Sequence, residues 1–148
     1  MAIEIDRIKE NYSFTEWDVK VLLRLASIMG KHTEDFTDEF YTKIKKFKNA
    51  SKYLKNQKII ERHREAIKGW FFKLFNGPFD DNYLYYLEKI GYTHVKIDLP
   101  SHYVNVSINF VRNYCIEVLM NEVPDCEERS DMIVSLGKIL DINLDVLT

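Results

Sequence analysis

Apolar residues recur at helical spacing along almost the whole chain, and breaks in that spacing divide it into segments. From Val19 to Met29 the apolar positions follow an i, i+3, i+4, i+7 pattern, which is typical of one buried helix face. Similar stripes predict six main helices, at about residues 14–29, from 33, at 56–76, 81–96 and 101–120, and after 125. A short helix is expected before the first of these. No segment has a convincing strand pattern, so the predicted fold class is all-α.

Capping residues and breakers mark the expected helix ends. Ser13 and Glu16 form an S-x-x-E capping box at the start of the first main helix, and Gly30 is expected to end it. Asn76-Gly77-Pro78 is a strong stop signal, since glycine and proline both interrupt a helix there. Further expected caps are Asp80 or Asp81, and Ser101.

Composition narrows the class of protein. The 148 residues suit one domain, and 46% hydrophobic with 30% charged residues excludes a disordered or fibrous chain. We see no repeat or flexible linker, so residues 1–148 are expected to form a single domain. The formal net charge of −2 argues against binding to nucleic acid. Residues 43–58 hold seven lysines and no acid, and we expect them to form an exposed connection.

Cysteines and targeting signals point to the cytoplasm. Cys115 and Cys126 are the only cysteines, and they form no C-x-x-C motif. No apolar run approaches the roughly 18 residues of a membrane span, and the amino terminus lacks the regions of a signal peptide. One feature is unusual: nine phenylalanines, nine tyrosines and two tryptophans indicate a bulky core or a large flat guest.

Two histidines lie on apolar helix faces. His63 shares its face with Ile59, Ile67 and Trp70, and His94 lies on the face of Leu87 and Ile90. Burying imidazole costs free energy unless its nitrogens find partners. A lone histidine of this kind is more often a hydrogen-bonded core residue than a ligand. Two of them on successive helices make a metal a serious alternative, because neutral imidazole is a good ligand for iron.

Most other metal centres do not fit. The sequence has no Glu-x-x-His pair for a di-iron bundle, no His-x-x-x-His pair, and too few cysteines for a cysteine-rich zinc site. What remains is a cofactor that takes one or two ligands from facing helices. Heme is the foremost candidate, since its flat apolar ring is surrounded by aromatic and branched side chains.

Several short motifs follow one another along the chain: Asp38-Glu39-Phe40-Tyr41, Trp70-Phe71, Leu74-Phe75 before Gly77, Asp80-Asp81, Tyr83, Ile90-Gly91 followed by His94, and Ile97, Leu99-Pro100 and Tyr103. In these motifs the chain resembles the globin domain of bacterial globin-coupled sensors, which are related to protoglobins, over nearly its whole length. The resemblance implies a globin fold with an extra amino-terminal helix, and heme b (iron protoporphyrin IX) as cofactor.

Residue by residue, the resemblance places His94 as the proximal heme ligand. Tyr41 matches a distal tyrosine that hydrogen-bonds bound O2 in such sensors. His63 departs from the family, which often has an apolar residue there. Two roles are open to it: it coordinates the iron from the opposite face, giving a bis-histidyl heme, or it only donates a hydrogen bond to the bound ligand. We favour coordination.

Further residues are expected near the cofactor. His102-Tyr103 stands where the family commonly has Trp-Tyr, and Tyr103 is expected either to hydrogen-bond the proximal imidazole or simply to pack. A lysine of the 43–58 run, or Arg64, is an alternative partner for a heme propionate. The expected ring contacts, for each of which ordinary core packing is the competing interpretation, are Phe47, Ile67, Phe71, Leu87, Ile90, Val95 and Ile108.

The function expected from these features is the sensing of a diatomic gas, O2 or also CO or NO, without enzymatic activity. The resemblance implies a homodimer formed by the last two long helices, and an output domain that is absent from these 148 residues. The chain is then either a single-domain globin or an excised sensor domain. Two rival hypotheses are a heme enzyme that acts on peroxide, nitrite or NO, and a cofactor-free helical interaction module.

Overall fold

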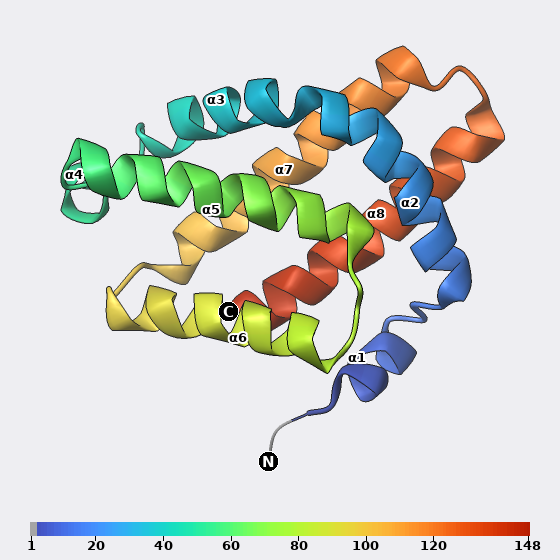
Figure 1. The fold of residues 1–148 in the computed structure, drawn as a ribbon, viewed down its shortest axis with the longest axis horizontal. Coiled ribbons are helices and arrows are strands. Elements are labelled where there is room, and N and C mark those ends of the chain that lie inside the picture. Colours follow the sequence, from blue (N-terminus) through green and yellow to red (C-terminus); the bar gives the residue numbers. More distant parts are fainter. Residues whose placement is uncertain (1–2) are drawn as a thin grey trace.

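Helices and one short 3₁₀ turn make up most of the computed structural model, which describes residues 3–148 and has no strand within them (Figure 1). In chain order the elements are α1 (Ile5–Asn11), α2 (Glu16–Met29), η1 (Gly30–His32), α3 (Thr33–Ile44), α4 (Ala50–Tyr53), α5 (Gln57–Asn76), α6 (Asp81–Lys96), α7 (Ser101–Glu122) and α8 (Cys126–Leu147). The all-α prediction is confirmed, and so are the six main helices and the short one before them.

Side-chain caps set the starts of three long helices. The Asn56 side chain accepts a hydrogen bond from the Ile59 N–H at 2.9 Å, and Asp80 accepts one from the Tyr83 N–H at 3.1 Å. Asp125 caps α8 in the same way. Helix α5 ends where expected, because Gly77 has a φ of +61° that disfavours any residue with a Cβ.

The start of α2 lies two residues later than predicted. Its capping box is formed by Thr15 and Asp18, whose carboxylate accepts a hydrogen bond from the Thr15 N–H at 2.9 Å. Ser13 has a φ of +54° and lies outside the helix. Gly30 ends α2 without a left-handed turn, since its φ is −57° and the chain continues into η1.

Two further local predictions are corrected. Ser101 does not cap α7: it is the first helical residue, Pro100 occupies the cap position, and no side chain bonds there. The helix also runs on to Glu122 rather than Met120. The lysine-rich connection contains the short α4, and all seven of its lysines are exposed.

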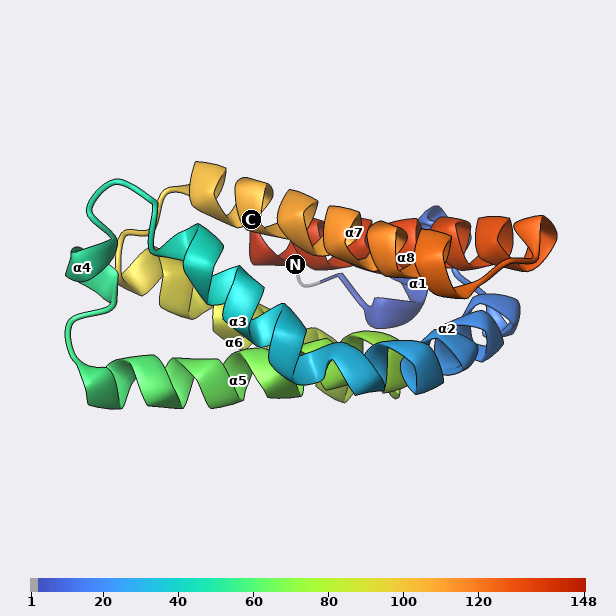
Figure 2. The same ribbon diagram turned by 90° about the horizontal axis from the view of Figure 1, so that it is seen from above.

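The helices form two layers with the core between them. Figure 2 shows α7 and α8 side by side along one side of the molecule, with α2, α3 and α5 along the other. Helix α6 lies beside α5 and runs antiparallel to it (Figure 1). Long side chains from both layers meet in the interior and are no more than 1% exposed: Leu22, Leu25, Met29, Phe36, Phe71, Leu74, Leu119, Met132, Leu136, Ile139 and Leu140.

Many of the aromatic residues pack in this core. Phe36 of α3 stacks on Phe71 of α5, with ring centroids 3.9 Å apart, and meets Tyr114 of α7 edge-on at 5.4 Å. Such pairs add stability beyond their buried area. A bulky core therefore explains much of the aromatic content.

Candidate functional site

Helices α5 and α6 each have one half packed on the core and one half left partly uncovered. In α5 the buried residues are Trp70, Phe71, Leu74 and Phe75, all in the second half. In α6 they are Tyr83, Leu84 and Leu87, all in the first half. Because the helices are antiparallel, both packed halves adjoin the Gly77 turn and both uncovered halves lie at the opposite end (Figure 1).

The two histidines lie on the uncovered halves. His63 of α5 and His94 of α6 are both half-buried. The apolar residues around them, which the sequence pattern predicts to be buried, are only half-buried: Ile59, Ile60, Ile67 and Ile90. An apolar stripe that the chain itself does not cover is a favourable surface for a flat apolar guest.

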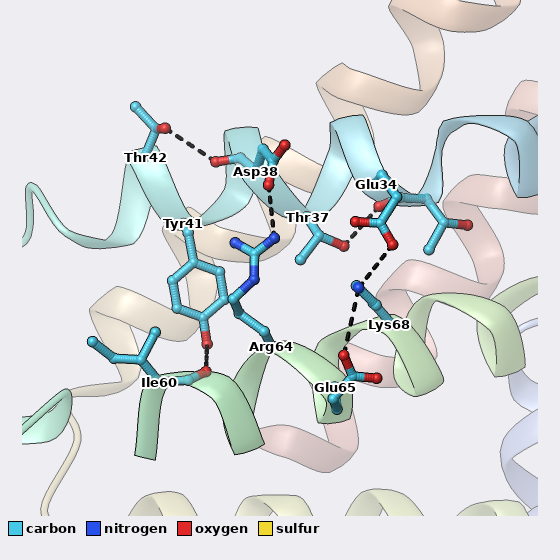
Figure 3. A network of polar contacts seen from close by, with 10 residues as sticks. Glu34, Thr37, Asp38, Tyr41, Thr42, Ile60, Arg64, Glu65 and Lys68 are labelled. Atoms are coloured by element: carbon cyan, nitrogen blue, oxygen red, sulfur yellow. Dashed lines mark hydrogen bonds and ion pairs between the residues drawn. The ribbon is translucent and has the colours of Figure 1, made fainter. Parts of the chain in front are cut away.

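His63 has one protein partner. Its Nδ1 is hydrogen-bonded to the hydroxyl of Tyr41, which lies near the end of α3 and is only 2% exposed. The same hydroxyl lies 3.4 Å from the backbone carbonyl oxygen of Ile60, one turn before His63 (Figure 3). Within residues 3–148 no hydrogen bond involves the other ring nitrogen of His63, Nε2.

The imidazole of His94 has no hydrogen-bonding partner among the described residues. Its Nδ1 is buried and is the one buried side-chain nitrogen or oxygen of residues 3–148 without a partner. Nearly all buried polar groups in proteins are paired, so an orphaned imidazole nitrogen marks a place where a ligand is expected.

Both imidazoles have a lowered pKa, which favours their neutral form. Burial lowers the pKa of His94 below its ordinary value. Burial also lowers the pKa of His63, and the nearby His94 lowers it further by charge repulsion. Neutral imidazole has a free lone pair, which metal coordination requires.

A polar seam of two ion pairs ties α3 to α5. Arg64 pairs with Asp38 at 2.7 Å, and Lys68 pairs with Glu34 at 2.8 Å (Figure 3). The Arg64 guanidinium also lies 5.2 Å from the centroid of the Tyr41 ring, a cation–π contact. Arg64 therefore contacts two side chains of α3, those of Asp38 and Tyr41. Its pairing with Asp38 depends on how two helices cross, and no spacing in the sequence indicates it.

Tyr103 shows the packing role, one of the two that were expected, and adds a hydrogen bond to the backbone. Its hydroxyl donates to the backbone carbonyl of Lys48 at 2.9 Å, and its ring stacks on Phe47 with centroids 4.5 Å apart. It makes no hydrogen bond to His94. These two contacts tie the start of α7 to the lysine-rich connection. No sequence motif predicts them.

The expected ring contacts divide by burial. Phe71, Leu87 and Ile108 are in the core, at 1%, 0% and 4% exposure. Three others, Phe47, Ile67 and Ile90, are half-buried. Val95 is 78% exposed, so the structure does not bring it to the others by packing.

The fold is that of the globins, and comparisons with known proteins agree. The sequence profile of the protoglobin family matches residues 2–148, and the chain belongs to that family. The globin domain of a Geobacter sulfurreducens globin-coupled sensor is 34% identical, with a TM-score of 0.93 over 99% of this chain and 96% of that one.

The globin domain of E. coli DosC supports the fold alone. Its ferric form is 17% identical, with a TM-score of 0.81 over 95% of this chain and 97% of that one. Its ferrous form is 18% identical, with a TM-score of 0.80 over the same shares. No curated protein has a significantly similar sequence. Among the described residues, no helix has the length and apolar character needed to cross a membrane.

Protoglobins bind heme b, and the residues present fit this cofactor. Burial lowers the pKa of both imidazoles, and His94 has a buried nitrogen without a partner in residues 3–148. Half-buried isoleucines flank them on both helices. Iron bound to such ligands in an apolar shell is the arrangement that heme proteins use.

Proposed function

We propose that residues 1–148 form one sensor domain that binds a diatomic gas, O2 and also CO or NO, at heme. The heme iron supplies the gas-binding position, and the protein sets its ligands, polarity and access. The likeness to a domain of a globin-coupled sensor, at 34% identity, supports a sensing role. No enzymatic turnover is proposed for this domain.

The observation that carries the proposal is the buried Nδ1 of His94, which has no partner in residues 3–148. His94, with its orphaned Nδ1, would hold the iron from the proximal side. His63, whose Nε2 has no protein partner among residues 3–148, would hold it from the other side. A gas ligand must then compete with His63, so the affinity for gas depends on how firmly α5 presents this residue.

The remaining expected residues are proposed to form the walls of the heme site. Phe47, Ile67 and Ile90 are half-buried, Ile67 and Ile90 each one turn from a histidine, and we place all three against the ring. Leu87 and Ile108 are core residues that would close its inner side, and Phe71 supports α5 from within by stacking on Phe36. Tyr103 would act by holding the 43–58 connection, and Val95 has no role here.

A homodimer through α7 and α8 would carry the signal to an output domain. Both helices have apolar residues on the side away from the core, including Met120 at 57% and Val134 at 52% exposure. No other described element covers that side (Figure 2). Movement of α5 and α6 on gas binding would then change the interface. We assign the protein to the cytoplasm, where free cysteines such as Cys115 and Cys126 persist.

Absorption spectra of the heme-reconstituted protein test the proposal. The reduced, gas-free protein should show a Soret band and sharp paired visible bands. His94→Ala should lose heme or change its ligation, and His63→Ala should lose the paired bands. His102→Ala, at an exposed position on α7, is the matched control and should behave as wild type. Absence of a Soret band would overturn heme binding, and unchanged paired bands in His63→Ala would overturn coordination by His63.

A further inference from the structure

The hydroxyl of Tyr41 lies between two groups on one turn of α5. One is Nδ1 of His63, to which it is hydrogen-bonded, and the other is the carbonyl oxygen of Ile60, at 3.4 Å. The ring is held in place by the Arg64 guanidinium, which is itself fixed by Asp38. With the side chain 2% exposed, the hydroxyl has little freedom to seek another partner.

The hydrogens of this pair can be arranged in two ways. A neutral imidazole has one N–H and one lone pair, and a tyrosine hydroxyl donates one hydrogen. If Tyr41 donates to Nδ1, then Nε2 of His63 carries the hydrogen and has no lone pair to offer. If Nδ1–H donates to Tyr41, then Nε2 keeps its lone pair, and the hydroxyl needs an acceptor of its own.

The Ile60 carbonyl is that acceptor. A buried hydroxyl that accepts a hydrogen bond but donates none loses free energy through the unpaired O–H. With Ile60 at 3.4 Å, Tyr41 can accept from His63 and donate to the backbone at the same time. Each donor of the second arrangement therefore has an acceptor on the same turn of α5.

We propose that Tyr41 is a positioning residue that acts through His63: it accepts Nδ1–H, donates to Ile60, and so keeps the lone pair on Nε2. The inference rests on the proposed function, because the lone pair matters only if Nε2 takes the iron. It differs from direct contact with a gas ligand, since the Tyr41 hydroxyl already has two partners on α5.

Tyr41→Phe is the sharpest variant, because it removes the hydroxyl and keeps the ring beneath Arg64. Loss of one hydrogen bond should weaken His63 ligation by about tenfold. The reduced, gas-free protein should then show weaker paired bands, and CO should associate about tenfold faster. Tyr114→Phe is the matched control: Tyr114 is also buried, and its hydroxyl donates to Asp35 at 2.7 Å on a different pair of helices.

A second set of variants separates the two roles of a tyrosine. In a His63→Leu background, adding Tyr41→Phe should leave gas association and dissociation within about twofold, since the hydroxyl no longer has an imidazole to position. A several-fold faster O2 dissociation in that background would show direct contact with the gas and overturn the inference.

Nitrogen NMR of the heme-free wild-type protein, labelled with ¹⁵N-histidine, reads the proton directly and needs no variant, because no iron is present there to force the hydrogen onto Nδ1. We expect the hydrogen of His63 on Nδ1; a hydrogen on Nε2 would overturn the inference. If His63→Ala loses the paired bands while Tyr41→Phe keeps them, the inference fails and the proposed function stands. If His63→Ala itself keeps the paired bands, both fail.

Discussion

At the end of α5 and α6 that adjoins the Gly77 turn, three buried side chains satisfy one another. The side-chain oxygen of Asn143 on α8 accepts from the indole N–H of Trp70 at 2.9 Å, and its amide nitrogen donates to the hydroxyl of Tyr83 at 2.9 Å and to the Ile139 carbonyl at 2.8 Å. At the other end, His94 Nδ1 is buried and has no partner in the described chain.

This contrast separates stability from binding along the same two helices. Burying a polar group costs free energy unless it is hydrogen-bonded, and the Asn143 cluster meets that condition within the protein. The histidine end does not, and its isoleucines are also only half-buried. One end should therefore determine how stable the fold is, and the other how tightly the cofactor is held.

The largest effect on stability is expected from Asn143→Ala. The change removes three hydrogen bonds and leaves the Trp70 N–H buried without an acceptor, which should lower the free energy of unfolding by about 3 kcal/mol. Denaturant unfolding followed by circular dichroism measures this. Asn113→Ala, at an exposed position on α7, should change it by less than about 0.5 kcal/mol. If the two variants were equally stable, the cluster would not hold the helices together.

The opposite behaviour is expected of His94→Ala. Loss of a residue that only supports a metal ligand typically lowers the affinity for the metal by about 10- to 100-fold. Loss of the ligand itself should therefore speed the transfer of heme to an acceptor globin by more than about 100-fold. The unfolding free energy of the heme-free protein should fall by less than about 1 kcal/mol, since this imidazole makes no hydrogen bond there. A large loss of stability without heme would contradict the separation.

A smaller effect is expected from the seam above the histidines. The Asp38 side chain is 68% exposed, so its pair with Arg64 should contribute about 0.5 kcal/mol. A double-mutant cycle of Arg64→Ala and Asp38→Ala measures this coupling, and about 1 M salt should reduce it. A coupling of 2 kcal/mol or more, roughly four times our estimate, would mean that the histidine end supplies much of its own stability.

The sequence predicted the main helices because their signals are local. Periodic apolar positions, the Gly77 break and the Asp80 cap act within a few residues. The capping of α2 could not be chosen in this way, because Ser13/Glu16 and Thr15/Asp18 are overlapping boxes. Asp18 is fixed by α8, where Ser135 donates to it at 2.7 Å and Lys138 at 3.2 Å.

The same distinction, between signals within a few residues and contacts between distant helices, applies to the candidate site. Periodicity put His63 and His94 on the apolar faces of their helices, because a helix face follows from spacing alone, and the structure leaves both half-buried. It could not show that Tyr41 meets His63, since that contact depends on how α3 crosses α5. It also missed the Lys48 carbonyl as the partner of Tyr103, because a backbone acceptor in an irregular segment leaves no pattern in the sequence.

The smallest expected effect tests whether burial, rather than position along the helices, decides how much a polar group contributes to the free energy of unfolding. Glu122 at the end of α7 is paired with His32 and, at 3.3 Å, with Lys31, far from the histidine end. The hydrogen bond from His32, with Lys31 adding to it, lowers the pKa of Glu122 below its ordinary value of 4.5.

A carboxyl with a lowered native pKa stabilises the fold above its unfolded pKa, and this contribution disappears as the pH falls through the native value. Glu122→Gln should therefore be slightly less stable than wild type at pH 6, and the difference should vanish once the pH lies below the lowered native pKa. A difference at pH 6 as large as that of Asn143→Ala would mean that an exposed pair matters as much as a buried cluster, and the contrast drawn from burial would fail.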